Sequence, residues 1–194
     1  MKTIIGVFVL IQLSLSSLHS FSQAADPKSS SRSSAQYDAA SISANIAYNR
    51  DIMYLSRMGS ERGTKTETIE EADEMLTDFT ELLYSFEQLE TSAGNKAKQA
   101  GVSSQAVELN EALSSARGFS FDTLWMGGML RMHQAKLIDL AAQKENSTDS
   151  RLKTSVTQAM PILKRHITKL NSLQKQMVRK NLQEKKEAAK QKIK

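Results

Sequence analysis

The sequence contains no cysteine among its 194 residues. Disulfide bonds, thiol chemistry, cysteine-based zinc sites and iron–sulfur clusters are therefore excluded, so that packing of secondary structure has to hold the fold together. Three familiar catalytic motifs are also missing: a Gly-x-Ser-x-Gly elbow, a glycine-rich phosphate loop and a His-Glu-x-x-His zinc motif. We therefore expect a protein that is not an enzyme and that has no cofactor.

The chain also lacks a hydrophobic run suited to spanning a membrane, which needs roughly 20 apolar residues. Its longest run, residues 4–18, follows Lys2 and precedes Ser22-Gln23-Ala24, which is the layout of a secretory signal peptide. We expect residues 1–24 to be a signal peptide cleaved after Ala24, and the mature chain to be periplasmic or secreted. A retained membrane anchor is the alternative. Because no cysteine follows the run, a lipid-anchored lipoprotein is excluded.

Charge is unevenly distributed along the chain. The whole sequence has 26 Lys and Arg against 21 Asp and Glu, a net charge of +5, whereas residues 164–194 alone hold 11 basic and two acidic residues. A basic end of this kind attracts anionic lipid or glycan, and solvated charge without a partner is the other interpretation. No aromatic residues are interleaved with the cations, so nucleic acid is not expected as a partner. The candidate contact residues are Arg179, Lys180, Lys185, Lys186 and Lys190.

Apolar residues recur at helical spacing in four long stretches, and no segment alternates convincingly like a β-strand. The spacing predicts long helices over about 37–58, 66–91 and 148–194, and another that starts near 120 and is ended by the connection over 145–150, with a short crossing helix over about 103–116. Four amphipathic helices with a crossover between the second and third predict an all-α helical bundle. The expected organisation is a flexible Ser-rich spacer over 25–36, a bundle domain over 37–178 and a basic tail, helical or disordered, over 179–194.

Two details of this interpretation concern packing. The first helix is predicted to end at about Met58, broken by Gly59–Gly63. It is predicted to bury one stripe at alternating spacing of four and three, composed of Ala40, Ala44, Ala47, Asp51, Tyr54 and Met58 and widened by Ile42, Ile46 and Met53. Glycine is unfavourable inside a helix, so the pair Gly127-Gly128 beside Trp125 indicates a close approach of another helix. A ligand pocket at this pair is the alternative.

Only two histidines follow the signal segment, and both fall on or beside an apolar stripe. His133 lies within the stripe of the third long helix and His166 at the edge of the fourth, while Asp51 lies on the stripe of the first. A metal or redox site formed by these three residues is one hypothesis. Neither histidine follows an acid by three residues, as in the Glu-x-x-His pattern of di-metal bundles. A buried, hydrogen-bonded His–Asp pair and two unrelated, half-exposed histidines are the alternatives.

The chain resembles the bacterial domain-of-unknown-function family 4142, exported proteins assigned to the ferritin-like superfamily. Phe121-Asp122, His133 and Met160-Pro161-x-Leu163-x-x-His166 are similar to the family's Phe-Asp, its downstream His and its Leu-Pro-x-Leu-x-x-His stretch. The resemblance covers roughly residues 37–175 and implies a ferritin-like four-helix bundle. The chain departs from the pattern at Phe79, where the family commonly has histidine, and at Met132, where it commonly has aspartate. These departures argue against a metal site.

We therefore expect an exported, non-catalytic helical bundle of the periplasm or cell envelope that acts through surface contacts. One alternative is a ferritin-like metal-binding or redox protein that holds a transition metal through His133, His166 and Asp51. The other is an envelope-associated module whose basic tail binds anionic lipid or glycan. An anionic membrane surface or another envelope protein is the expected partner.

Overall fold

The computed structural model describes residues 27–92 and 102–191. Within these residues the regular secondary structure is entirely α-helical, which confirms the predicted all-α class. The helices are α1 (Pro27–Arg62), α2 (Thr66–Ser92), α3 (Ser104–Ser115), α4 (Gly118–Asn146) and α5 (Ser150–Gln191). The predicted signal peptide, with its cleavage site after Ala24, lies outside the described residues. None of the helices in the described part is both long and apolar enough to cross a membrane.

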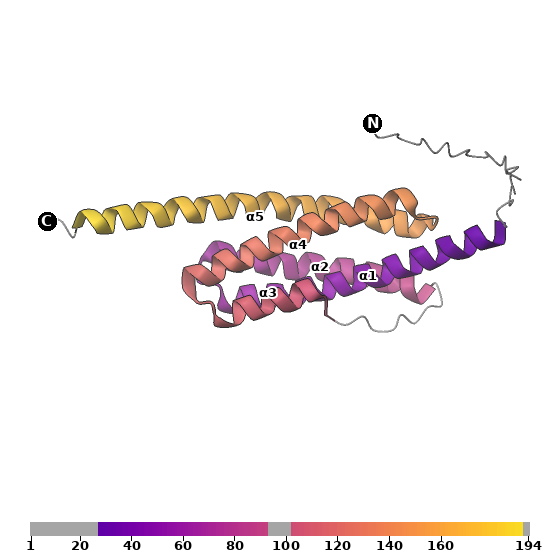
Figure 1. Ribbon diagram of the computed structural model, residues 1–194, viewed down its shortest axis with the longest axis horizontal. Helices are drawn as coiled ribbons and strands as arrows, with labels where there is room; N and C mark the ends of the chain where they lie inside the picture. Colours follow the sequence, from indigo (N-terminus) through magenta and orange to yellow (C-terminus); the bar gives the residue numbers. More distant parts are fainter. Residues whose placement is uncertain (1–26, 93–101, 192–194) are drawn as a thin grey trace, which may run out of the picture.

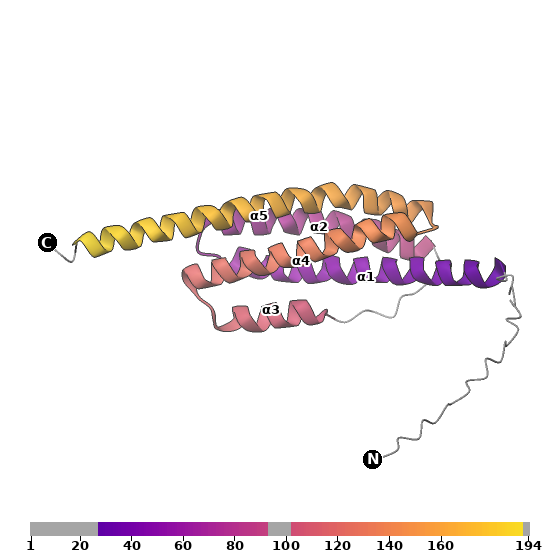
Figure 2. The ribbon, with the colours of Figure 1, turned by 45° about the horizontal axis from the view of Figure 1, so that its top comes forward.

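The four long helices lie side by side, and the short helix α3 packs on the outside (Figures 1 and 2). Short turns join α1 to α2 and α4 to α5, so that each pair forms an antiparallel hairpin with extensive contacts. α5 packs on α2, while α3 contacts α4 and α1. The bundle thus consists of two helical hairpins. Their crossover includes α3, and residues 93–101 of it lie outside the described part.

The predicted bounds of α2, α3 and α4 agree with the structure to within two residues, but two other predictions were wrong. Residues 27–36 belong to α1 and are not a flexible spacer; proline is well suited to the first helical position, where α1 begins. α1 also continues through Gly59 to Arg62. At the other end of the chain, the basic tail is helical as far as Gln191.

The buried face of α1 agrees with the predicted stripe only in part. Ile42, Ile46 and Asp51 are buried as predicted. Ala40, Ala44 and Tyr54 are exposed instead, whereas Ile52 and Leu55 are completely buried. The same buried face carries three polar residues, Asn45, Asn49 and Ser56. The side-chain amide of Asn45 donates a hydrogen bond of 2.8 Å to Gln143 Oε1 on α4, whereas its Oδ1 atom has no hydrogen-bond partner among the described residues. Polar residues on the core side masked the hydrophobic period that the prediction relied on.

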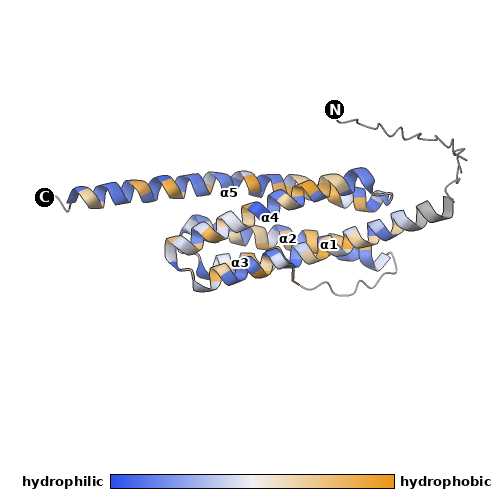
Figure 3. Cartoon of the chain, viewed as in Figure 1, coloured by the Kyte–Doolittle hydropathy of each residue, from blue (hydrophilic) through white to orange (hydrophobic). Residues whose placement is uncertain are grey.

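The apolar stripes of α2 and α5 are buried largely as predicted. Fully or nearly fully buried members include Met75, Phe79 and Phe86 of α2 and Val156, Leu163 and Leu170 of α5. Figure 3 shows the contrast along α5, whose projecting end is mostly hydrophilic. Burial of these side chains supplies the main driving force for assembly, at roughly 1.5–3 kcal/mol for each large apolar side chain.

Two glycines allow helices to approach closely. Trp125 of α4 is completely buried against α1, and its indole N–H donates a hydrogen bond of 2.8 Å to the carbonyl oxygen of Leu55. A Cβ atom at Gly59 would lie 2.5 Å from Trp125 Cε2, and one at Gly128 would lie 2.4 Å from both Leu109 methyl carbons. The predicted close approach therefore holds for Gly128, against α3, whereas Gly127 has ordinary space around it.

We predict opposite effects of adding one methyl group at two helical glycines. Gly59→Ala is expected to destabilise the protein by about 1–2 kcal/mol, because displacing the rigid indole outweighs the roughly 1 kcal/mol gained in helix propensity. Gly127→Ala, whose new Cβ would meet nothing closer than 3.5 Å, is expected to stabilise it by up to about 1 kcal/mol. Urea unfolding followed by circular dichroism measures both. If both variants changed the free energy of unfolding by the same amount in the same direction, the close contact at Gly59 would be contradicted.

Candidate functional site

The two histidines meet in the centre of the bundle. His133 from α4 and His166 from α5 are completely buried, and their ring centroids lie 5.7 Å apart. Phe79 from α2 packs 5.2 Å from the ring of His133 and 5.8 Å from that of His166. Tyr48 from α1 lies 6.2 Å from the His133 ring. Each long helix thus contributes one ring, and the hypothesis of two unrelated, half-exposed histidines was wrong.

Two carboxylates of α2 hold the ring of His166. Its Nδ1 atom lies 2.8 Å from Glu71 Oε1, and its Nε2 atom lies 2.8 Å from Asp78 Oδ2. Glu71 and Asp78 are seven residues, or about two turns, apart and therefore share a face of α2. Both ring nitrogens of His166 are therefore within hydrogen-bond distance of a carboxylate oxygen, which fixes the orientation of the ring. The buried His–Asp pair expected as an alternative would have used Asp51; in the structure the aspartate that contacts His166 is Asp78, whose side chain is 18% exposed.

Further ion pairs surround this pair. Lys169 Nζ lies 2.9 Å from Glu71 Oε2 and also contacts Glu74, whose pKa is lowered first of all by its hydrogen bond with Lys169. Arg165 pairs with Asp78 and lies 3.3 Å from Glu74 Oε1. Three acids of α2 thus face three cationic groups of α5. We call this set the α2–α5 charge cluster: Glu71, Glu74, Asp78, Arg165, His166 and Lys169.

His133 differs from His166 in its protonation. Its Nδ1 atom lies 2.8 Å from the carbonyl oxygen of Met129, which only accepts, so Nδ1 carries the proton. Nε2 is therefore a bare lone pair, and it has no hydrogen-bond partner in the part of the chain that the structure describes. Burial, followed by the charge of His166, lowers the pKa of His133 to about 3. The centre thus combines a neutral histidine, His133, with one whose ring nitrogens both face carboxylates, His166.

Asp51 has a different role from the one predicted. It is buried, but its Oδ2 atom accepts a hydrogen bond of 3.1 Å from the backbone N–H of Ser103. Ser103 is the N-cap of α3, and its side chain accepts from the backbone N–H of Ala106. Asp51 therefore anchors the start of α3 on α1, while Glu71 and Asp78 of α2 contact His166.

The donor set at the centre does not fit a ferritin-like metal site. Among the described residues, no group of three or more His, Asp or Glu side chains is arranged to hold a metal ion. Both nitrogens of His166 are engaged by carboxylates, and those carboxylates are paired with Lys169 and Arg165. Only Nε2 of His133 offers a free lone pair, and a single nitrogen does not make a transition-metal site.

The acids of the α2–α5 charge cluster were missed in the sequence because they interact across helices. A signal for them exists: Glu71, Glu74 and Asp78 recur at spacings of three and four. The cations Arg165 and Lys169 recur at a spacing of four on the last helix. Such complementary spacing on two helices indicates a paired face, although it leaves the register between the helices open.

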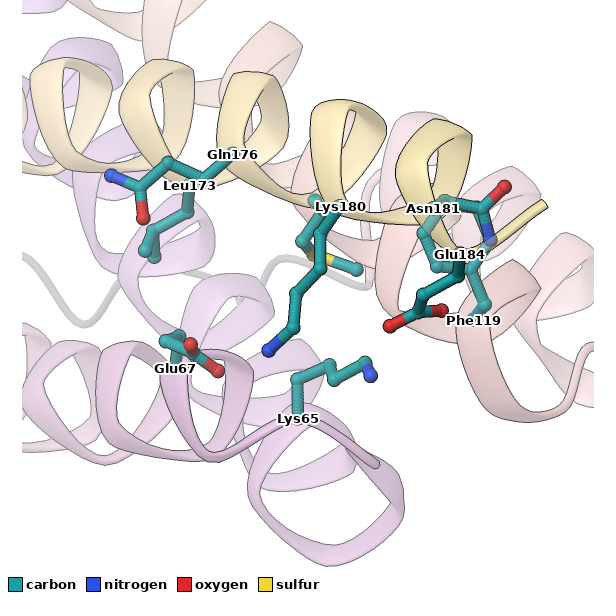
Figure 4. A pocket seen from close by; sticks show the side chains of 9 residues that line it. Lys65, Glu67, Phe119, Leu173, Gln176, Lys180, Asn181 and Glu184 are labelled. Carbon is teal, nitrogen blue, oxygen red and sulfur yellow. The ribbon is translucent and has the colours of Figure 1, made fainter. Parts of the chain in front are cut away.

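The projecting end of α5 forms a second feature, outside the bundle (Figure 1). Residues 178–191 are exposed except Asn181, which is half-buried, and they carry five basic residues against Glu184 and Glu187, a net charge of +3. Helical spacing places Arg179 and Lys186 on the outer side, together with Lys175. Lys180 instead reaches back toward the start of α2 (Figure 4). One of the five predicted contact residues therefore belongs to another surface.

Comparison with known proteins gives one match. The sequence model of a protein family described as Domain of unknown function (DUF4142) matches residues 22–173. No curated protein and no solved structure matches the chain.

We predict that the α2–α5 charge cluster depends on the negative charge of Glu71. Glu71→Gln is expected to destabilise the protein by about 3–5 kcal/mol, because it removes the buried carboxylate that contacts both the ring of His166 and Lys169. Glu87→Gln, which removes an acid from the exposed Arg50–Glu87 pair of 2.8 Å, is expected to cost less than about 1 kcal/mol. Urea unfolding at pH 7 compares the two variants. Equal losses would show that the cluster has no need of an ionised Glu71.

His133 is expected to make the protein less stable in acid. Its pKa of about 3 in the folded state lies below the ordinary value of 6.5, so the unfolded chain binds a proton first as the pH falls. Between pH 6 and pH 4 this contributes a loss of about 2 kcal/mol, at 1.36 kcal/mol for each unit of pKa difference. His133→Phe removes this contribution while the other titrating groups remain. Urea unfolding at several pH values tests it, and equal pH slopes for both proteins would contradict it.

Proposed function

The chain belongs to the family that shares the domain of unknown function DUF4142, and we propose that it is an exported, non-catalytic bundle protein that binds anionic lipid surfaces through the projecting end of α5. The observation that carries this proposal is the outer face of that end. Lys175, Arg179 and Lys186 are exposed there together with Val178 and Leu182, which are 45% and 54% exposed.

This outer face has the composition of a helix that lies on a membrane surface. Spacings of three and four place the two aliphatic side chains between the cations along one side of α5. Interfacial helices insert apolar side chains at the headgroup boundary while their Lys and Arg side chains contact anionic lipids. An anionic glycan would engage the cations but leave Val178 and Leu182 in water. Lipid is therefore the better match.

The centre of the bundle supports a non-catalytic role. A general base or nucleophile has to come within hydrogen-bond reach of its substrate. His133 and His166 are completely buried, and the polar atoms of His166 are engaged within the α2–α5 charge cluster. These groups hold helices together, so we assign contacts with other molecules to the surface.

The location in the periplasm or cell envelope rests on the signal-peptide layout of residues 1–24. The assignment to the ferritin-like superfamily is likewise part of the proposal. Two antiparallel hairpins joined by one crossover are consistent with it, because that connection is typical of ferritin-like folds.

We predict that the protein binds vesicles containing phosphatidylglycerol and that salt weakens this binding. Replacing Lys175, Arg179 and Lys186 together by glutamine is expected to lower the affinity about 100-fold, at about 1 kcal/mol for each cation near an anionic surface. Leu182→Ser is expected to weaken binding as well, because it removes an inserting side chain. Vesicle co-sedimentation of the mature chain measures both effects.

A matched variant controls for total charge. Arg57, Arg131 and Lys144 are exposed on the bundle and have no ion pair among the described residues, so replacing these three by glutamine removes the same charge elsewhere. This variant is expected to bind like the unmodified protein. Equal losses in both triple variants, or equal binding to uncharged phosphatidylcholine vesicles, would overturn the proposal.

A further inference from the structure

A groove lies where α5 leaves the bundle, between α5, the start of α2 and the start of α4 (Figure 4). Its apolar part is formed by Phe119 of α4 and by Leu173 and Met177 of α5, which are one turn apart. Phe119 and Leu173 are half-buried, so apolar surface remains accessible from the groove. The cavity volume is about 180 Å³, smaller than the roughly 300–1,000 Å³ of sites for drug-sized ligands. It suits one small molecule with an apolar group.

Four charged side chains surround the apolar part, two of each sign. Lys65 and Glu67 come from the start of α2, and Lys180 and Glu184 from α5. In Figure 4 Lys180 extends toward the segment that carries Lys65 and Glu67. None of the four takes part in an ion pair with another described residue. The groove thus offers two ammonium groups and two carboxylates that are free for a ligand.

We propose that this groove binds a free amino acid with an apolar side chain, of which leucine is the simplest probe. The carboxylate of such a zwitterion pairs with Lys65 and Lys180, where the positive N-terminal end of α2 adds to the attraction. Its ammonium pairs with the acids of the groove, and its side chain covers Leu173 and Met177. A ligand with one charge satisfies only half of this set.

The groove and the outer face of α5 lie on opposite sides of the helix. At 3.6 residues per turn, Met177 and Arg179 are separated by about 200° around the helix axis. Met177, Lys180 and Glu184 therefore face the bundle, whereas Arg179 and Lys186 face away from it. A membrane bound by the outer face leaves the groove turned toward water. The ligand is thus taken from solution, and the two sites are testable separately.

Methyl NMR of protein labelled with [13C-methyl]methionine tests the proposal, because Met177 is a direct reporter. Leucine is expected to shift the Met177 resonance in a saturable way at concentrations up to about 10 mM, a weak-binding range. Two single-charge analogues separate the contributions of the charges. Both 4-methylpentanoate, which lacks the ammonium, and 3-methylbutylamine, which lacks the carboxylate, are expected to bind at least about tenfold more weakly, since each loses a charge-assisted contact.

Variants locate the site. Lys180→Gln and Glu184→Gln are each expected to weaken leucine binding about tenfold, a difference of about 1.4 kcal/mol in binding free energy. Leu173→Trp is expected to abolish leucine binding by filling the groove. Circular dichroism verifies that each variant is folded. The matched control is Lys175→Gln, which removes a cation of the same helix on its outer face. This variant is expected to leave the affinity for leucine unchanged.

Three results would overturn the zwitterion site: no saturable shift of Met177, an analogue that binds as tightly as leucine, or equal losses in the Lys180 and Lys175 variants. Vesicle binding distinguishes this failure from failure of the proposed function. Leu173→Trp is expected to bind vesicles like the unmodified protein, whatever its effect on leucine.

Discussion

The contact between the imidazole ring of His166 and two carboxylates of α2 constrains the whole bundle. Burying charge is costly unless each group has a well-placed partner. Glu71 and His166 are completely buried, so their pairing requires α5 to lie along α2 in one register. With that register set, Leu163 and Leu170 of α5 enter the core. The residues beyond Met177 then extend past the other helices, where they meet solvent.

The contact of His166 with the carboxylates of α2 also determines the role of the polar groups in the centre of the bundle. A charged His166 beside His133 adds to the effect of burial and keeps His133 neutral, which leaves one bare nitrogen in an apolar enclosure of aromatic rings. The acids near His166 are held by cations of α5. The polar groups of the core thus secure α2 against α5. Binding is consequently assigned to the surface, where α5 presents a cationic face on one side and a groove of mixed charge on the other.

The helices themselves were predictable because hydrophobic period reflects local backbone geometry. In α2 and α5 the stripes through Phe79 and Leu163 are strongly apolar, and the structure buries both residues. In α1 the prediction was right only in part, because polar residues such as Asn45, whose side-chain amide donates to Gln143, a residue 98 positions away, interrupt the apolar pattern of the core side. The end of α1 was misjudged for a related reason. Gly59 looked like a helix breaker, although it is the residue that makes room for Trp125.

The sequence by itself determined the all-α class, the absence of thiol chemistry, the existence of long amphipathic helices and the basic end of the chain. These properties depend on composition and on neighbours within a few residues. Only the tertiary structure decided that His166 pairs with Glu71 and Asp78, which are 95 and 88 positions away, and that Asp51 anchors α3. Contacts between helices depend on their rotation and register, which side-chain packing sets across the whole bundle and which spacing along one helix leaves open.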